Sequence, residues 1–424
     1  MNRVQTAEKL LKIASRSGSR LGLERVLELS SLLGDPQDKL KTIHIAGTNG
    51  KGSLNAMLSA VLREQGYKVG SFTSPAMLSY NDQIRINGIP VSNKILDEAV
   101  VKAEEKAGKM LDHPTEFELL TVAAFLIFSE QRCDICLIEC GMGGDTDSTN
   151  IIKKPLLSVI TNVTLDHCSI LGNTTAEIAS HKAGIIKQGV PVFFGGDDKD
   201  AHSVIKRKAV RNGSKLYTAD RSLFERHYDP GFTALKYNGR VYRTSLRGEF
   251  QYENLQNCIS CVEILRSNGT VISYHALKNG LLNVHWEGRF ETLSSDPLIV
   301  FDGAHNPDGM KKLCSSIKTL FGDDRPAVLI GVLADKDYSI YPEMLEGLVS
   351  RAFAVSPDNP RALPSVKLAE CLNNGRICCD SFPDIPSGFD AAVDWCIRNT
   401  HSLLVIGSIY MYKDIKACAE KLKG

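Results

Sequence analysis

A glycine-rich stretch near the N-terminus contains the residues best suited to bind a phosphate. An apolar run, 42–46, leads into it and an amphipathic run, 54–65, follows, which predicts a strand, a turn and a helix. Such a turn points backbone N–H groups at an anion, and the helix N-terminus adds a positive dipole end. A lysine there could reach the β- and γ-phosphates of ATP, and a serine hydroxyl could join a Mg²⁺ shell. The residues predicted to bind ATP are Gly47, Thr48, Asn49, Gly50, Lys51, Gly52 and Ser53.

The match to the general phosphate-loop pattern is incomplete. Ile45 stands where that pattern has its first glycine, and Gly52 separates Lys51 from Ser53. The alternative interpretation is a glycine turn that merely joins a strand to a helix. However, special loops follow four predicted strands, and in a parallel sheet such loops gather at one edge. These loops lie at 47–53, 73–75, 139–144 and 166–167.

Composition limits the class of protein. The 424 residues predict two or three domains, and a hydrophobic content of 43% with 23% charged residues is typical of a soluble globular protein. A net charge of +1 gives no field that would attract nucleic acid or an acidic membrane. The chain has neither a transmembrane run nor the apolar core of a signal peptide, so we expect a cytoplasmic location. The 12 cysteines should then be reduced, and we interpret them as packing residues.

The order of elements that must position these loops predicts an α/β fold. Residues 6–33 are predicted to be helical, and strands then alternate with helices up to a polar break at 293–297. This first part is expected to be a P-loop ATPase domain with a doubly wound, mainly parallel sheet. A second alternation predicts a smaller, Rossmann-like α/β domain. The expected domains are therefore residues 1–295 and 296–424.

The stretch 44–53, His-Ile-Ala-Gly-Thr-Asn-Gly-Lys-Gly-Ser, resembles the signature of the folylpolyglutamate synthases, a branch of the Mur ligases, and the extra Gly52 belongs to that pattern. The resemblance implies an ATP-dependent ligase that adds L-glutamate to the γ-carboxylate of a folate through an acyl phosphate. It also implies a monomer that binds these small substrates. Further matches span most of the chain: Thr73-Ser74-Pro75, Glu139-x-Gly-x-Gly-Gly144, Asp147-x-Thr149-Asn150, Leu165-Asp166-His167, Lys182-Ala-Gly-Ile185, Gly288-Arg289-Phe290, Asp302-Gly-Ala-His305-Asn306-Pro307, Leu333-Ala-Asp-Lys336-Asp337 and Gly407-Ser408-x-Tyr410.

Phosphoryl transfer between two anions needs positive charge, which predicts a catalytic role for Lys51 together with Mg²⁺. Ser53 and Glu139 are hard oxygen ligands, although Glu139 could instead cap the following turn. The resemblance adds Ser74 and His167 to the metal site, together with a second Mg²⁺. By itself, His167 would be interpreted as a histidine packed after a strand.

Lys182 is the least obvious of the predicted metal ligands. By sequence alone it would be a solvated lysine on a helix. In the family that this chain resembles, the matching lysine is carbamylated and becomes a carboxylate-like metal ligand. This reaction requires a neutral amine, and therefore a pKa lowered near cations. A carbamylated Lys182 with a catalytic and metal-binding role is our hypothesis.

The family's nucleotide contacts match Asn257, Arg289 and Asp302, and its residues around the transferring phosphate and the glutamate match His305 and Ser408. Because these residues stand on both sides of the predicted domain boundary, the resemblance implies ATP between the domains and a site assembled by domain closure. The alternative interpretations are a surface salt bridge for Arg289 and turn capping for Asp302.

Three alternative functions share some of these sequence features. Many bifunctional relatives have Gly-Gly-Arg where this chain has Gly143-Gly144-Asp145, so the dihydrofolate synthase reaction, which joins glutamate to dihydropteroate, stays open. A Mur ligase of cell-wall synthesis usually has an N-terminal domain for a uridine nucleotide, and only about 40 residues precede the loop. A nucleotide switch without ligation would not need Glu139, His167 and Lys182.

Overall fold

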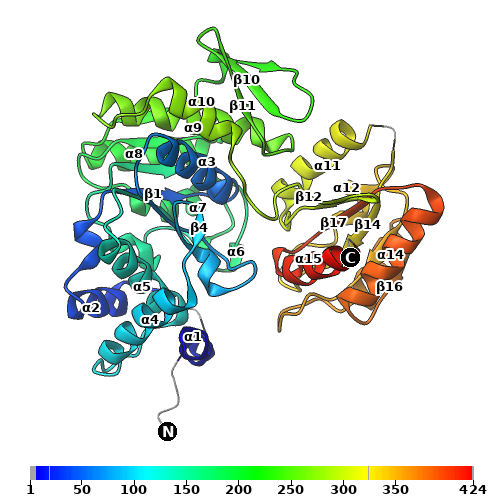
Figure 1. The fold of residues 1–424 in the computed structure, drawn as a ribbon, viewed down its shortest axis with the longest axis horizontal. Coiled ribbons are helices and arrows are strands. Elements are labelled where there is room, and N and C mark those ends of the chain that lie inside the picture. Colours follow the sequence, from blue (N-terminus) through cyan, green and yellow to red (C-terminus); the bar gives the residue numbers. More distant parts are fainter. Residues whose placement is uncertain (1–5, 19, 323, 423–424) are drawn as a thin grey trace. The chain divides into compact units, whose positions relative to one another are not determined.

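The computed structural model describes residues 6–18, 20–322 and 324–422, and the chain divides into two compact units (Figure 1). Unit 1 consists of Met1–Arg226, Leu235–Arg243 and Glu253–Val284, and unit 2 consists of His227–Ala234, Thr244–Tyr252 and His285–Gly424.

Unit 1 is built on an eight-stranded sheet with the order β4-β3-β2-β5-β1-β6-β7-β8. The six strands from β2 to β8 in that order are parallel, and β3 and β4 form an antiparallel edge. The predicted doubly wound, mainly parallel sheet is therefore confirmed. The strands are β1 (Thr42–Ala46), β2 (Val69–Phe72), β3 (Ile84–Ile86), β4 (Ile89–Pro90), β5 (Ile135–Glu139), β6 (Leu157–Ile160), β7 (Val192–Phe194) and β8 (Leu216–Thr218).

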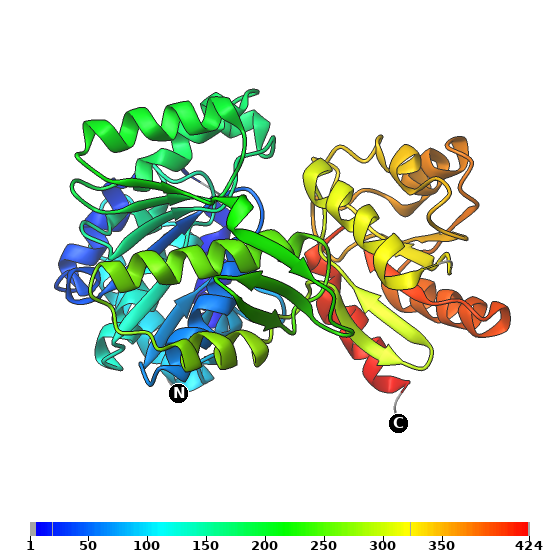
Figure 2. The same ribbon diagram turned by 90° about the horizontal axis from the view of Figure 1, so that it is seen from above.

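Helices lie on both sides of this sheet (Figure 2). Helices α1, α2, α4 and α5 share a buried apolar core with β2 and β5, while α7 and α8 pack beside β6 and β7. The helical stretch predicted at 6–33 is two helices instead, because the chain between them contains Gly18 and Gly22, both at positive φ. The helices are α1 (Ala7–Ala14), α2 (Glu24–Leu32), α3 (Lys51–Glu64), α4 (Asn93–Ala107), α5 (Glu116–Glu130), α6 (Cys168–Leu171), α7 (Thr175–Lys182), α8 (Lys199–Arg211), α9 (Phe250–Ser267) and α10 (Tyr274–Leu282).

A separate three-stranded sheet has the order β11-β10-β9. Its strands are β9 (Phe224–His227), β10 (Thr233–Tyr237) and β11 (Arg240–Thr244). Asn238 and Gly239 connect β10 to β11 with φ values of 48° and 75°, as a tight hairpin turn of this sequence requires.

Unit 2 contains a six-stranded sheet with the order β12-β13-β17-β14-β15-β16, in which only the β12–β13 pair is antiparallel. The predicted boundary after residue 295 falls between β12 and β13. The polar break at 293–297 therefore contains the turn of a hairpin. The elements are β12 (Glu291–Ser295), β13 (Leu298–Phe301), α11 (Pro307–Phe321), β14 (Ala327–Ile330), α12 (Tyr341–Leu345), β15 (Ala352–Ala354), α13 (Ser365–Asn374), β16 (Cys379–Ser381), α14 (Ile385–Asn399), β17 (Leu403–Ile406) and α15 (Tyr412–Lys421).

Candidate functional site

The glycine-rich loop lies directly between β1 and α3, as the sequence predicted. Gly47 and Gly50 have φ values of 150° and 85°, which L side chains rarely adopt. A Cβ on Gly47 would collide with the Thr161 hydroxyl, and one on Gly50 would lie 2.5 Å from Asn254 Oδ1. Because α3 begins at Lys51, its N-terminal N–H groups follow directly from the loop. The loop therefore has the backbone shape of an anion-binding turn.

The segment after β6 holds this loop in place. Asn162 Oδ1 accepts the Asn49 N–H at 2.8 Å, and its carbonyl accepts the Thr48 N–H at 3.1 Å. The Thr161 hydroxyl donates to the Asn49 carbonyl at 2.6 Å. The Thr48 hydroxyl donates to the Thr164 carbonyl at 3.1 Å. Asn162 was not among the predicted site residues, although its place directly after a predicted strand was a usable signal.

Lys51 and Glu139 are brought together at the end of adjacent strands. Glu139 is the last residue of β5, which pairs with β1, and it is only 3% exposed. Lys51 Nζ lies 4.0 Å from Glu139 Oε1 and donates to the carbonyls of Gly47 and Thr48 at 3.0 and 3.3 Å. The Lys51 side chain therefore bends back over the loop, and its ammonium lies beside the buried Glu139 carboxylate.

The remaining predicted metal ligands of unit 1 lie at the same edge of the sheet. Ser53 is buried in the first turn of α3, Ser74 follows β2, and His167 follows β6. The φ of His167 is 51°, an uncommon value outside glycine that often marks functional positions. Within the described ranges, no three His, Cys, Asp or Glu side chains gather as a metal site. The predicted set instead combines serine hydroxyls, one carboxylate, one imidazole and Lys182, and its hard oxygens suit Mg²⁺.

Lys182 is buried at the end of α7, with 4% of its surface exposed, so the solvated alternative is wrong. Burial, and then the charge of Lys51, lower the pKa of Lys182 to about 7. Near neutral pH a large fraction of this amine is therefore uncharged. The glycine turn after β5 packs against the same helix end, since a Cβ on Gly144 would lie 2.8 Å from the His181 carbonyl oxygen.

Asn257 is buried on α9 with an unused hydrogen-bond acceptor. The residue is 3% exposed, and its Oδ1 has no partner among the residues that the structure describes. Gly195, just after β7, leaves room for this amide, because a Cβ there would lie 2.6 Å from Asn257 Nδ2. An unpaired buried acceptor costs about 1–3 kcal/mol unless a ligand or water supplies a donor.

The other four predicted residues belong to unit 2. Asp302 and His305 follow β13, and Ser408 follows the adjacent strand β17. Arg289 precedes β12, whose first residue pairs with the last residue of β13.

Asp302 is 2% exposed, and its two oxygens accept the N–H groups of Ala304 and Phe290 at 2.8 and 2.9 Å. These hydrogen bonds are those of a turn-capping carboxylate, which was the alternative interpretation of Asp302. Burial raises the pKa of Asp302, and the charge of Arg289 opposes that rise.

Close packing and hydrogen bonds fix the other three residues of this group. Arg289 lies against Gly303, where a Cβ would be 2.6 Å from its guanidinium. His305 Nδ1 lies 2.8 Å from the Gly303 carbonyl oxygen and donates to it. The buried Ser408 hydroxyl accepts the Tyr410 N–H at 3.3 Å.

Comparison with known families and proteins gives consistent matches over nearly the whole chain. The Mur ligase middle domain matches residues 45–262, and the Mur ligase glutamate ligase domain matches residues 288–409. The dihydrofolate synthase/folylpolyglutamate synthase of Bacillus subtilis is 36% identical over 414 residues, which cover 94% of this chain and 95% of that protein. The folylpolyglutamate synthase of Lacticaseibacillus casei is 37% identical over 367 residues, covering 83% of this chain and 85% of that protein.

Solved structures agree with these matches. The Mycobacterium tuberculosis folylpolyglutamate synthase complexed with ADP and AMPPCP has a TM-score of 0.88 at 28% identity, covering 98% of both chains. Escherichia coli FolC in complex with DHPP and ADP has a TM-score of 0.87 at 26% identity, covering 99% of both chains. No helix in the described part of this chain is long and apolar enough to span a membrane.

Proposed function

This chain belongs to the Mur ligase family, in the branch of folylpolyglutamate and dihydrofolate synthases, and we propose that it joins L-glutamate to the γ-carboxylate of a folate, converting ATP to ADP and phosphate. The observation that carries this proposal is the glycine-rich loop with Lys51 beside the buried Glu139, at a separation of 4.0 Å. A phosphate in the loop would meet backbone N–H groups and the Lys51 ammonium.

The chemistry follows from the needs of an acyl phosphate. The folate carboxylate attacks the γ-phosphorus, and ADP leaves as the bond from that phosphorus to the β-phosphate oxygen breaks. The glutamate amine then attacks the acyl carbon, and phosphate leaves as the nitrogen loses a proton. Lys51 offsets the negative charge as two anions approach each other. Ser53, Ser74, Glu139 and His167 would hold two Mg²⁺ ions, which would supply further positive charge at the phosphate oxygens when bound.

We propose that Lys182 is carbamylated and joins the metal ligands. Its burial and its lowered pKa provide the neutral amine that must attack CO₂, with loss of one proton and formation of an N–C bond. The product is a carboxylate-like group beside Lys51, whose charge would stabilise it.

The nucleotide contacts are assigned from chemistry. The unpaired Asn257 Oδ1 suits an exocyclic amino group such as that of adenine. Arg289 suits a phosphate, and Asp302 suits ribose hydroxyls if one of its oxygens accepts a further donor. We assign His305 and Ser408 to the transferring phosphate and the glutamate. The position of ATP between the domains stays a prediction.

A second activity, dihydrofolate synthase, is favoured by a specific observation. The Bacillus subtilis relative, which this chain matches along nearly its whole length, is named for both reactions. We propose that the chain also accepts dihydropteroate, because dihydropteroate and a tetrahydrofolate would each present a carboxylate to the same loop. Both molecules are therefore tested as acceptors.

We further propose that the protein acts in the cytoplasm as a monomer on small-molecule substrates. The 12 cysteines are free of disulfides, as expected in a reducing compartment. The net charge of +1 supports neither nucleic acid nor an acidic membrane as a partner.

The test is incubation with ATP, Mg²⁺, labelled glutamate and each acceptor, followed by separation of amide products. We expect a labelled folylglutamate, and the absence of any amide product with either acceptor would remove the ligase proposal.

Lys51→Ala should abolish turnover, with a loss of at least about 100-fold, because charge stabilisation of a transferring phosphoryl group is a large term. The circular dichroism spectrum should stay unchanged, since Lys51 is a partly exposed residue at the first position of α3. A fully active Lys51→Ala variant would refute its phosphate role.

A further inference from the structure

The turn that carries Arg289 has an unusual backbone shape. Gly288 and Phe290, on either side of Arg289, have φ values of 68° and 49°, and the second value is rare for a bulky aromatic residue. Phe290 is 4% exposed and packs in the apolar core of unit 2. A backbone of this kind persists only where the surrounding contacts hold it. The contacts of this turn therefore decide where the Arg289 side chain begins.

Three hydrogen bonds hold the turn at its two ends. The Gly288 N–H donates to Glu291 Oε2 at 2.7 Å, and the Gly288 carbonyl accepts the Gly303 N–H at 3.1 Å. The Phe290 N–H donates to Asp302 Oδ2 at 2.9 Å. The last two bonds attach the turn to the segment after β13. The first one depends on a side chain, that of the residue at which β12 begins.

The second oxygen of this carboxylate is held from α15. Tyr412, the first residue of that helix, is fully buried, and its hydroxyl donates to Glu291 Oε1 at 3.1 Å. The Tyr412 ring meets the Phe301 ring edge-on with 5.1 Å between the centroids, and Lys416 Nζ lies 5.4 Å from the Tyr412 ring centroid. Because packing fixes the ring, the hydroxyl holds the carboxylate in line with the Gly288 N–H.

The same helix contacts the residue just before the turn, and the Arg289 side chain leaves the turn on the other side. Lys416 on α15 pairs with Glu287 at 3.5 Å. The guanidinium passes close to the backbone of the segment after β13, since a Cβ on Gly303 would lie 2.6 Å from Arg289 Nη1. A long side chain that leans on one backbone is aimed by the backbone from which it starts.

We infer that Glu291 and Tyr412 are positioning residues that set the Arg289 guanidinium for a phosphate of the nucleotide. The Tyr412 hydroxyl fixes the Glu291 carboxylate, the carboxylate fixes the Gly288 N–H, and the turn fixes Arg289. All of these groups belong to unit 2. The inference rests on the proposed function, in which Arg289 binds a phosphate of ATP.

This arrangement predicts which kinetic quantity changes. A guanidinium that binds a phosphate equally in the ground state and in the transition state lowers KM without changing kcat. Misplacing Arg289 should therefore weaken the binding of ATP and ADP and leave the rate with bound ATP nearly unchanged. A single lost hydrogen bond of this kind corresponds to about a 3- to 10-fold loss of affinity.

The experiment compares variants that differ by few atoms. Tyr412→Phe removes only the hydroxyl, Glu291→Met removes both acceptor oxygens, and Glu291→Gln keeps one oxygen for the Gly288 N–H. Tyr341→Phe is the matched control, because Tyr341 is also a fully buried first residue of a helix in unit 2, and its hydroxyl has no partner among the described residues. The measurements are kcat, KM for ATP, the ADP dissociation constant by calorimetry and the thermal midpoint. Each variant is also made in an Arg289→Met background.

We expect KM for ATP and the ADP dissociation constant to rise about 3- to 10-fold in Tyr412→Phe, and at least as much in Glu291→Met. Both quantities should stay within about twofold of the wild type in Glu291→Gln and in Tyr341→Phe, and kcat should stay within about twofold throughout. In the Arg289→Met background, Tyr412→Phe should cause no further loss of affinity, because the hydroxyl acts through Arg289. An equal loss in that background, or wild-type affinity in Tyr412→Phe, would overturn the inference.

Three results separate the possible failures. Wild-type protein that forms no amide product refutes the proposed function and removes the basis of the inference. An active wild type whose Arg289→Met variant binds ATP and ADP normally refutes the phosphate role of Arg289, and the positioning role with it. A weakened Arg289→Met beside an unaffected Tyr412→Phe refutes the positioning role alone. If Glu291→Met does not fold, the comparison of Tyr412→Phe with Tyr341→Phe decides, since each loses one oxygen atom.

Discussion

At the scale of single residues, Lys182 is the position where the structure changes the interpretation most. Its place on a helix gave no sign of burial, yet it is 4% exposed and lies close enough to Lys51 for that charge to lower its pKa. A buried ammonium beside another cation is costly. Conversion to the proposed carbamate would replace that repulsion with an attraction, and the burial that disfavours the ammonium leaves the neutral amine that this reaction needs.

Carbamylation of Lys182 gives a direct prediction. In ¹³C-bicarbonate, the protein should show one slowly exchanging carbamate resonance that is absent from Lys182→Ala, and this variant should lose about 10- to 100-fold in activity, as for loss of a metal-site partner. Lys187→Ala is the matched control, since Lys187 is another partly buried lysine with a lowered pKa that lies outside the proposed metal set. A spectrum without the resonance, or one that keeps it in Lys182→Ala, contradicts the carbamate.

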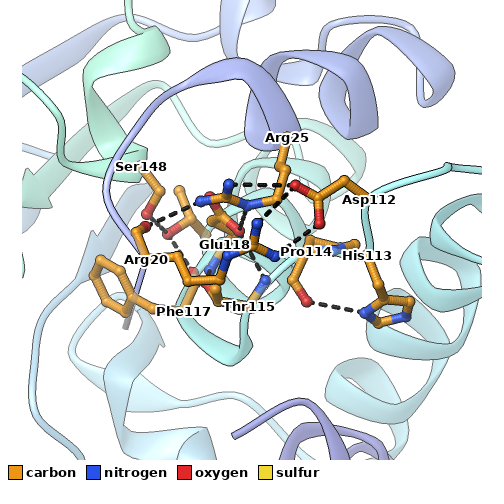
Figure 3. A network of polar contacts seen from close by, with 10 residues as sticks. Arg20, Arg25, Asp112, His113, Pro114, Thr115, Phe117, Glu118 and Ser148 are labelled. Carbon is orange, nitrogen blue, oxygen red and sulfur yellow. Dashed lines mark hydrogen bonds and ion pairs between the residues drawn. The ribbon is translucent and has the colours of Figure 1, made fainter. Parts of the chain in front are cut away.

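At the scale of elements, a buried ion pair joins α2 to the start of α5 (Figure 3). Arg25 Nε and Nη2 donate to the two carboxylate oxygens of Glu118 at 3.0 and 2.9 Å, and these residues are 7% and 3% exposed. Glu118 also accepts the Thr115 N–H at 2.7 Å and closes the capping box of α5. The pair therefore fixes both the beginning of α5 and the helix that covers it.

This pair predicts a large effect on stability. Glu118→Gln should lower the free energy of unfolding by about 3–5 kcal/mol, because it leaves the buried Arg25 guanidinium with only the half-exposed Asp112 carboxylate, 3.5 Å from its Nη1, as a counter-charge. Arg20→Met is the comparison: the Arg20–Asp112 pair has side chains 44% and 51% exposed, and such pairs contribute about 0–1 kcal/mol. Urea unfolding followed by circular dichroism measures both. Equal losses of unfolding free energy in the two variants would show that burial does not make the Arg25–Glu118 pair contribute more than an exposed pair.

The same elements show what the sequence can and cannot reveal. Strands buried on both faces are continuous apolar runs, so β5, β6 and β17 were predictable from residue types alone. A hydrogen bond from a side chain to a distant loop leaves no periodic signal, which is why Asn162 and the Arg25–Glu118 pair were missed. Burial of Lys182 was hidden for a similar reason, because it depends on a turn that belongs to another segment.

At the scale of the whole molecule, the domain boundary predicted from the sequence differs from the boundary between the compact units of the structure. A short polar break is typical of both a linker and a tight turn, and 293–297 is the turn between β12 and β13. The compact unit begins earlier, at His285, and includes Thr244–Tyr252. In unit 2, the Glu249 N–H donates to Ser316 on α11 at 2.9 Å, and Phe250 packs against the apolar core.

These contacts predict how two fragments behave. A fragment of residues 285–424 keeps β12 paired with β13 and should fold cooperatively, with a thermal midpoint below that of unit 2 in the full chain because it lacks Glu249 and Phe250. A fragment of residues 296–424 keeps β13 paired with β17 but turns it into an edge strand whose β12-facing side is unpaired, which favours aggregation. Circular dichroism melts and sedimentation compare the two. If the shorter fragment is equally stable and monomeric, β12 contributes nothing to unit 2 and the boundary belongs after residue 295. If neither fragment folds, the segments before His285 are an essential part of that core.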